Sequence, residues 1–205
     1  DASERLVVPS RAVRDGLLSS LGADAIADKL VMRAQGLFTR NRYRGLLDKR
    51  EPRIRLRDRL GISQDAVIAL SVGYADTRKG ADMLAQATVL AAAKRPDFHV
   101  VWVGHADPQL RSAIEAQLRA AGVVDRFHFV GLDFDTDDYY AGADVYALSS
   151  REDPFPSVVM ESLAVGTPVV AFAGTGGGAD LVDGCAGFAV PAFDIEAYAA
   201  ALLRV

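Results

Sequence analysis

The chain contains a single cysteine, Cys185, among its 205 residues. One cysteine excludes an internal disulfide and any metal site built from several cysteines, and it is compatible with a reducing compartment. We therefore predict a cytoplasmic protein with no cysteine-bound metal. Long apolar runs are also lacking, and none in the sequence is long enough to span a bilayer.

Positive charge is in short supply as well. The 23 Lys and Arg residues are outnumbered by 27 Asp and Glu residues, which gives a net charge of -4. Proteins that bind nucleic acids or membrane surfaces in a general way normally carry a basic excess. We expect no nucleic-acid partner, although local basic loops remain compatible with this charge.

What the chain does have is the composition of an ordinary globular protein, with 50% hydrophobic and 24% charged residues. A chain of this length can bury a full hydrophobic core. It starts at "DASERLVVPS" without Met and stops at "AYAAALLRV" inside a helical pattern. We therefore expect a piece of a longer protein.

The first 36 residues predict a small set of elements. An apolar run at 6–8 predicts a short strand, and Ser10 is placed to cap a helix that Gly22 ends. "DKLVMRAQGLF" predicts a second short strand. We interpret residues 1–36 as the tail of a preceding domain and the crossover from it.

Residues 37–59 are basic and irregular, with Pro52 inside. They predict a linker followed by a helix that ends at "RLGIS". We place the start of the main domain at residue 37 and extend it to 205, where we expect it to be truncated at its C-terminus.

The main domain shows a repeating pattern of buried strands and amphipathic helices. "AVIALSVG" is a β-branched run ending in Gly, typical of a strand buried on both faces, and "GADMLAQATVLAAAKRP" has helical spacing. This alternation predicts an α/β, doubly wound, Rossmann-like fold with a parallel sheet. The expected strands are 66–73, 98–104, 126–131, 144–150, 167–172 and 187–191, and the expected helices are 80–96, 108–122, 137–143, 157–166 and 178–184.

Ligands bind such a sheet at the carboxyl ends of its strands. Five loops lie there, at 73–80, 104–108, 131–138, 149–157 and 172–180. The first carries Arg78 and Lys79 directly before Gly80 and a helix start, which favours a phosphate site. A solvated basic turn is the alternative. The chain has neither a Walker loop nor G-x-G-x-x-G at this position, so classical dinucleotide binding loses support.

The third and fifth loops are less specific. In the third, Asp137 and Asp138 are explained as a capping run for the next helix, and a flexible acidic loop is favoured over a metal site. The glycines of "FAGTGGGADLV" permit close backbone approach, with a flexible surface turn as the alternative.

The fourth loop, "SSREDPFPSVVMESLAVGTPVVAF", holds two acids, Asp153 and Glu161, separated by seven residues. Burying an ionised carboxylate alone is costly, so Glu161 requires a partner. If a helix begins near Pro156, both acids can face one polyhydroxylated ligand. The backbone amides of residues 155–158 are then free to hold further oxygens.

Taken in order, these loops resemble the donor-binding half of retaining, Leloir-type glycosyltransferases of the two-Rossmann-domain (GT-B) architecture, particularly family four. The resemblance covers roughly residues 60–200. It rests on "LSVGYADTRKGADML", "VVWVG", "RFHFVG", "YYAGADVYALSSREDPFPSVVMESLAVGTPVVAF" and "GTGGGADLV".

The resemblance implies a role for each matching residue. Glu161 would bind the ribose of a nucleoside-diphosphate sugar, Lys79 would bind the pyrophosphate, and Asp153 would bind the transferred sugar. The family usually has Glu rather than Asp at this last position. Backbone groups complete the implied site, those of Phe155, Pro156, Ser157 and Val158 for the sugar and those of Val130, Gly131 and Leu132 for the base.

One departure from the family pattern concerns charge. Tyr74 follows Gly73 where the family usually has a basic residue. Either Arg78 supplies the second cation, which would make it catalytic together with Lys79 and Asp153, or diphosphate binding is weaker. Asp180 stands where Glu is common, a milder departure.

The implied activity is hexosyl or related transfer with retention of configuration, without a metal ion or cofactor, in polysaccharide or glycoconjugate biosynthesis. A carbohydrate, lipid or other acceptor would be bound mainly by the preceding domain, as would any membrane surface. This chain alone would then bind donor and transfer nothing. The alternatives are a non-catalytic nucleotide-sugar binding module and another enzyme of this architecture, such as an epimerase or a phosphorylase.

The three histidines are poor candidates for a general base. His99 and His128 alternate with core residues of predicted strands, which favours structural roles. His105 follows Gly104 at a strand end, where we expect it to lie near the donor.

Overall fold

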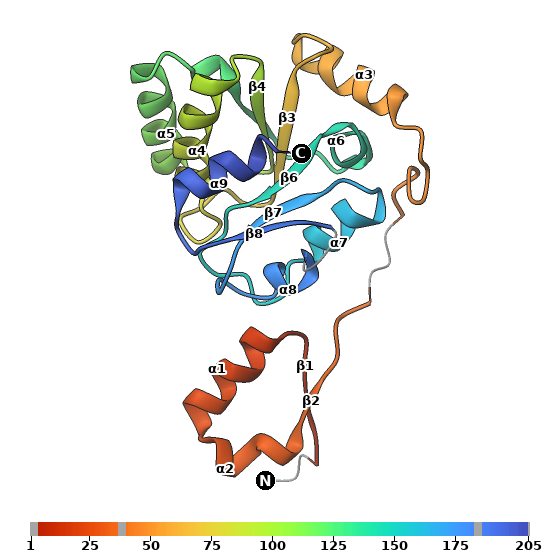
Figure 1. The fold of residues 1–205 in the computed structure, drawn as a ribbon, viewed down its shortest axis with the longest axis vertical. Helices are drawn as coiled ribbons and strands as arrows, with labels where there is room; N and C mark the ends of the chain where they lie inside the picture. Colours follow the sequence, from red (N-terminus) through yellow and green to blue (C-terminus); the bar gives the residue numbers. More distant parts are fainter. Residues whose placement is uncertain (1–3, 37–39, 183–185, 205) are drawn as a thin grey trace.

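A six-stranded parallel sheet forms the centre of the molecule (Figure 1). The computed structural model describes residues 4–36, 40–182 and 186–204. The strands are β3 (Val67–Val72), β4 (Phe98–Val103), β5 (Phe127–Gly131), β6 (Val145–Leu148), β7 (Val169–Phe172) and β8 (Gly187–Val190). Their order in the sheet is β5-β4-β3-β6-β7-β8. From β3 the chain adds strands first on one side and then, from β6, on the other, so the switch point at which ligands bind in doubly wound sheets lies between β3 and β6. The predicted α/β fold is confirmed.

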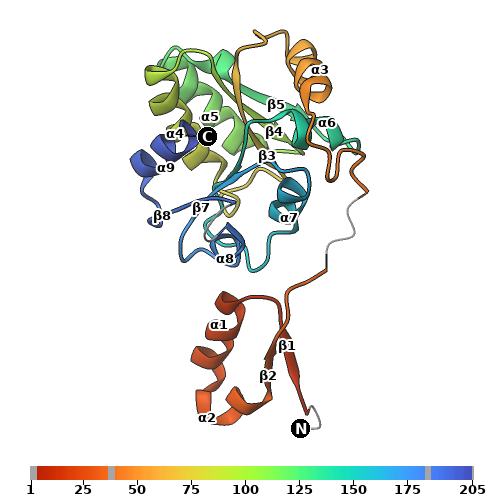
Figure 2. The same ribbon diagram turned by 45° about the vertical axis from the view of Figure 1, so that its right-hand side comes forward.

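Helices cover both faces of the sheet (Figures 1 and 2). One face carries α4 (Ala81–Lys94), α5 (Pro108–Ala120) and α9 (Ile195–Leu202). The other carries α3 (Arg50–Leu60), α6 (Asp137–Gly142), α7 (Ser157–Ala164) and α8 (Gly178–Val182). A short 3-10 turn, η2 (Val124–Arg126), leads into β5.

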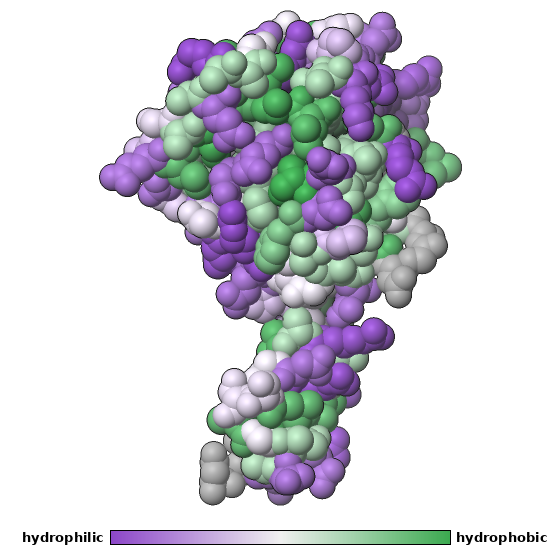
Figure 3. Space-filling model, turned by 60° about the vertical axis from the view of Figure 1, so that its left-hand side comes forward, coloured by the Kyte–Doolittle hydropathy of each residue, from purple (hydrophilic) through white to green (hydrophobic). Residues whose placement is uncertain are grey.

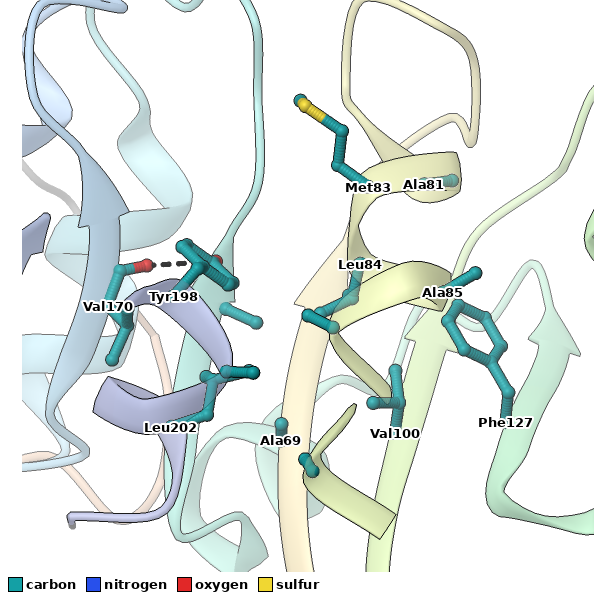
Figure 4. Close-up of a cluster of buried hydrophobic side chains, with 14 of the residues drawn as sticks. Ala69, Ala81, Met83, Leu84, Ala85, Val100, Phe127, Val170, Tyr198 and Leu202 are labelled. Carbon is teal, nitrogen blue, oxygen red and sulfur yellow. Dashed lines mark hydrogen bonds between the residues drawn. The ribbon is translucent and has the colours of Figure 1, made fainter. Parts of the chain in front are cut away.

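Alternate residues of the central strands enter two separate cores. On β6, for example, Val145 and Ala147 pack on the α4 side, and Tyr146 and Leu148 pack on the α7 side. Figure 4 shows part of the first core, where the Tyr198 hydroxyl of α9 donates to the Val170 carbonyl at 3.1 Å. Each fully buried side chain of this size contributes ~1.5–3 kcal/mol, so the two cores hold the strand ends in place.

The N-terminal residues form a separate small unit. It contains β1 (Leu6–Val8), α1 (Arg11–Leu21), α2 (Ala23–Ile26), η1 (Ala27–Lys29) and β2 (Leu30–Met32), and β1 pairs with β2 in parallel. Ser10 caps α1 and Gly22 ends it, as predicted. The space-filling view shows a narrow waist between this unit and the larger domain (Figure 3). A domain boundary near residue 36 stays a prediction.

The described part of the linker, from residue 40, lies against α6 and corrects one prediction. Asp137 and Asp138 do not cap α6, because its N-cap is Thr136, which makes no side-chain capping bond. The buried Asp138 carboxylate instead accepts hydrogen bonds from Arg55 at 2.9 Å and from Tyr43 at 2.8 Å. These bonds lower the pKa of Asp138, and they attach the linker and α3 to α6.

Candidate functional site

The loop after β3 and the loop after β6 meet at the switch point of the sheet. β3 and β6 pair at Ala69–Val145 and Leu70–Tyr146, and the loops begin where the strands end, after Val72 and Leu148. The Lys79 Nζ atom donates to Asp153 Oδ2 at 2.6 Å, and both side chains are mostly buried. Two residues that the sequence assigned to different parts of a donor are therefore in direct contact.

Glu161 is half-buried on α7 and differs from Asp153 in having no protein partner. Within the described ranges, its carboxylate makes neither a hydrogen bond nor an ion pair with another residue. Burial raises the pKa of Glu161, and the nearby Asp137 carboxylate adds to this effect. The acid that the sequence left without a partner is thus also unpaired in the fold, available to a ligand with hydroxyl groups.

Tyr146 of β6 is buried next to the end of β3. Its hydroxyl accepts a hydrogen bond from the Val72 amide at 3.1 Å. Burial raises the pKa of Tyr146 above the usual range, and the negative charges of Asp153 and Glu161 contribute to the rise.

The start of α7 lies between these two acids. Pro156 is the N-cap residue, and α7 begins at Ser157, as predicted. Among the residues that the structure describes, the amides of Phe155, Ser157 and Val158 have no protein acceptor. These groups can donate to oxygens of a bound molecule.

The glycine-rich loop after β7 packs directly on Asp153. The Asp153 amide donates to the Thr175 carbonyl at 2.9 Å, and the Gly177 amide donates to the Asp153 carbonyl at 3.1 Å. At Gly176, with φ +139°, a Cβ atom would lie 1.8 Å from the Asp153 carbonyl oxygen. Close backbone approach, the first of the two interpretations of this loop, is therefore confirmed at Gly176.

A cavity of about 210 Å³ opens at the carboxyl ends of β3, β4 and β5. Tyr74, His105 and Leu132 help to line it, and the position of His105 near a donor stays a prediction. Its lining residues are Val72, Gly73, Tyr74, Val103, Gly104, His105, Leu132 and Asp133. Val130, in contrast, is not part of this lining and packs against the core on the α7 side.

Arg78 is exposed, and its Nη1 atom donates to the Glu152 carbonyl at 3.1 Å. This contact ties the first loop to the fourth. Tyr74, at the position where the resemblance calls for a cation, is exposed at the edge of the cavity.

His99 and His128 lie away from this site and form a structural pair. His99 is buried, and its Nδ1 atom lies 3.0 Å from His128 Nε2. Arg126 Nη1 lies 2.9 Å from His99 Nε2. The arginine can only donate, so the proton of neutral His99 is on Nδ1, directed at His128. Burial, then His128 and then Arg126 lower the pKa of His99 to about 4. Their structural role is confirmed.

Two features of the site escaped sequence analysis. The first is an ion pair between Arg151 and Asp82, which are 69 residues apart. The second is a cavity of about 400 Å³ between α1 and the loops at 151–154 and 174–176, next to a 2.6 Å hydrogen bond from the Ser10 hydroxyl to the Pro154 carbonyl. In the sequence, these features correspond to an arginine beside two acids and to small residues on α1. Neither pattern indicates which residues they contact.

Two kinds of feature are missing from the described residues. They contain no group of three or more His, Cys, Asp or Glu residues arranged to hold a metal ion. Among the same residues, every helix is too short or too polar to cross a membrane.

Comparison with known proteins decides the family. Residues 66–205 match the family described as "Glycosyl transferases group 1". The chain belongs to this family. It is 32% identical to a D-inositol 3-phosphate glycosyltransferase of Streptomyces griseus, in an alignment covering 100% of the chain and 46% of that protein. It is also 32% identical to the lipopolysaccharide core biosynthesis glycosyltransferase LpsE of Rhizobium meliloti, over 73% of the chain and 42% of LpsE. This group 1 chain thus spans about half the length of the curated relatives it matches.

Solved structures show the same fold. HepE of Anabaena in complex with UDP superposes with a TM-score of 0.83 at 22% identity, covering 98% of this chain and 53% of HepE. WaaG, a glycosyltransferase involved in lipopolysaccharide biosynthesis, superposes with a TM-score of 0.79 at 20% identity, with the same coverage. At these identities the likeness establishes the GT-B fold alone.

Proposed function

We propose that this chain is the donor-binding half of a glycosyltransferase that transfers a sugar from a nucleoside-diphosphate sugar with retention of configuration and without a metal ion. The observation that carries the proposal is the contact between Lys79 and Asp153, together with Glu161 on the helix that follows Asp153, which has no partner among the described residues. A cation, a carboxylate and a second carboxylate on these adjoining segments fit a diphosphate, a sugar and a ribose.

The chemistry follows from the charges that develop during transfer. As the bond between the sugar and the diphosphate breaks, negative charge grows on the diphosphate and positive charge on the anomeric carbon. Lys79 would stabilise the diphosphate more strongly in this state than in the ground state, which is the condition for catalysis. Removing one such contact typically costs ~2–4 kcal/mol. Lys79 would therefore take the part that a metal ion plays in other enzymes.

Glu161 and Asp153 would divide the remaining polar groups of the donor. Glu161 would accept hydrogen bonds from the ribose hydroxyls, which replace the solvent lost on burial. Asp153 and the amides of Phe155, Ser157 and Val158 would hold the transferred sugar. We expect the base to bind in the cavity that Leu132 lines, and the UDP complex of HepE makes UDP the first nucleotide to test.

One observation favours the alternative of a non-catalytic nucleotide-sugar binding module. Tyr74 occupies a position that the resemblance reserves for a cation, so a binder with weaker contacts to the diphosphate would also account for the site. Hydrolysis of a donor by the protein together with its acceptor-binding domain separates the two functions. A cytoplasmic location and the absence of transfer by this chain alone stay predictions.

Calorimetric titration of the chain with UDP, GDP and ADP tests donor binding. We expect one nucleotide to bind, and Lys79→Ala to weaken it by about thirtyfold or more, because a charge-assisted contact to the diphosphate is lost. Glu161→Ala should weaken it by about tenfold or more. Lys94→Ala and Glu196→Ala, at exposed positions on α4 and α9, are the matched controls. Binding that neither site variant weakens would refute the proposed site.

A further inference from the structure

A second ion pair joins the two loops that carry Lys79 and Asp153. Arg151 Nη1 donates to Asp82 Oδ1 at 2.8 Å, and Arg151 Nη2 donates to Asp82 Oδ2 at 2.6 Å. This parallel, two-point geometry fixes orientation as well as distance. Asp82 comes three residues after Lys79, and Arg151 comes two residues before Asp153, so the pair lies close in sequence to both site residues.

Backbone contacts at Arg151 strengthen this connection. Its amide donates to the Arg78 carbonyl at 2.8 Å, and its Nη1 atom also donates to the Thr77 carbonyl at 2.5 Å. The Ser149 hydroxyl donates to the Lys79 carbonyl at 3.1 Å. Arg151 therefore holds the loop before Lys79 as well as the start of α4 after it.

The loops need such a connection because the sheet does not supply one. The pairing of β3 with β6 ends at Leu70 and Tyr146, well before Lys79 and Asp153. The ion pair between Lys79 and Asp153 is a further link between the two loops. A diphosphate would compete with Asp153 for the Lys79 ammonium group, and this link would then weaken when the donor binds.

We infer that Arg151 and Asp82 form a clamp that positions Lys79 and Asp153 for the donor diphosphate, with both clamp residues acting through the loops. This inference rests on the proposed donor site. The clamp is independent of the Lys79 ammonium, so it keeps the loops together while Lys79 turns from Asp153 to phosphate. Arg151 and Asp82 are positioning residues, and the donor need not touch them.

The role predicts a selective loss of affinity. Asp82→Asn and Arg151→Gln should each weaken UDP binding by about tenfold, a loss in the range measured for coupled neighbours. UMP lacks the second phosphate, so its affinity should change by less than about threefold. The double variant should bind UDP no more weakly than the weaker single variant, because both changes remove one interaction. Arg151→Lys keeps the positive charge but loses the two-point hydrogen bonding of the guanidinium group. It should therefore bind UDP more tightly than Arg151→Gln and less tightly than the unaltered chain.

Calorimetry with UDP and UMP, together with thermal melts, tests the clamp. Arg111→Gln is the control, since Arg111 forms an ion pair with Glu115 at 2.7 Å on α5 and does not line the cavity at the ends of β3, β4 and β5. The clamp is refuted if Asp82→Asn and Arg151→Gln bind UDP as the unaltered chain does while Lys79→Ala does not. Equal losses for UDP and UMP, or a large fall in melting temperature, would mean that the pair serves only stability. An unaltered chain that binds no nucleotide would overturn the proposed function itself, and the clamp with it.

Discussion

The environment of Glu161 is the one that most clearly favours binding of a ligand. Its carboxylate is half-buried, near Asp137, and within the described part of the chain no cation or donor is bonded to it. Asp153 is more deeply buried and is neutralised by Lys79. The two ionised carboxylates thus differ in their effect on the free energy of unfolding. That difference can be measured without knowing the substrate.

Glu161→Gln should raise the stability of the ligand-free chain at neutral pH. Burial raises the pKa of Glu161 in the folded state, so ionisation costs folding free energy as the pH rises through that pKa. The gain on substitution should be full above the folded-state pKa and should vanish as the pH falls below about 4.5, the ordinary value. Thermal melts across this pH range measure it, with Glu196→Gln as the control. A variant less stable than the unaltered chain at every pH would show that Glu161 has a stabilising protein partner.

Asp153 lies on the loop after β6, and the loops after β3 and β7 both contact it. Lys79 of the first binds its carboxylate, and in the second Thr175 accepts from its amide and Gly177 donates to its carbonyl. The close approach of Gly176 leaves no room for a side chain. The geometry of the site is therefore set by the packing of these loops as much as by the reactive side chains.

Gly176→Ala tests that packing. The added Cβ would lie 1.8 Å from the Asp153 carbonyl oxygen, so Asp153 or the glycine loop must move, at a cost of ~1–3 kcal/mol in stability. We also expect weaker binding of a UDP-sugar, because Asp153 is displaced from the position in which it would hold the transferred sugar. Gly174→Ala is the matched control, since it also has positive φ, at +75°, but its Cβ would meet no atom within 4 Å. Equal UDP-sugar affinity in the two variants would contradict the role given to this loop.

Sequence patterns predicted the parallel sheet because its strands are apolar runs that end in glycine and alternate with helices. They also brought Lys79, Asp153 and Glu161 to one edge, since the carboxyl ends of parallel strands meet there. Sequence patterns did not predict the clamp between Arg151 and Asp82. A pair 69 residues apart depends on how two loops pack, and charge alone names no partner. The same reason explains the error at Asp138, whose partners come from the linker and α3 rather than from the helix it begins.

The carboxyl ends of the strands face the small N-terminal unit, and the donor site that we propose lies there, at the switch point of the sheet (Figure 2). A crystal structure of the chain with UDP tests this account most directly. We expect the diphosphate within hydrogen-bond distance of Lys79 Nζ, the ribose hydroxyls on Glu161 and the uracil in the cavity lined by Leu132. UDP bound elsewhere, with Lys79 still paired to Asp153 and Glu161 still unpartnered, would contradict it.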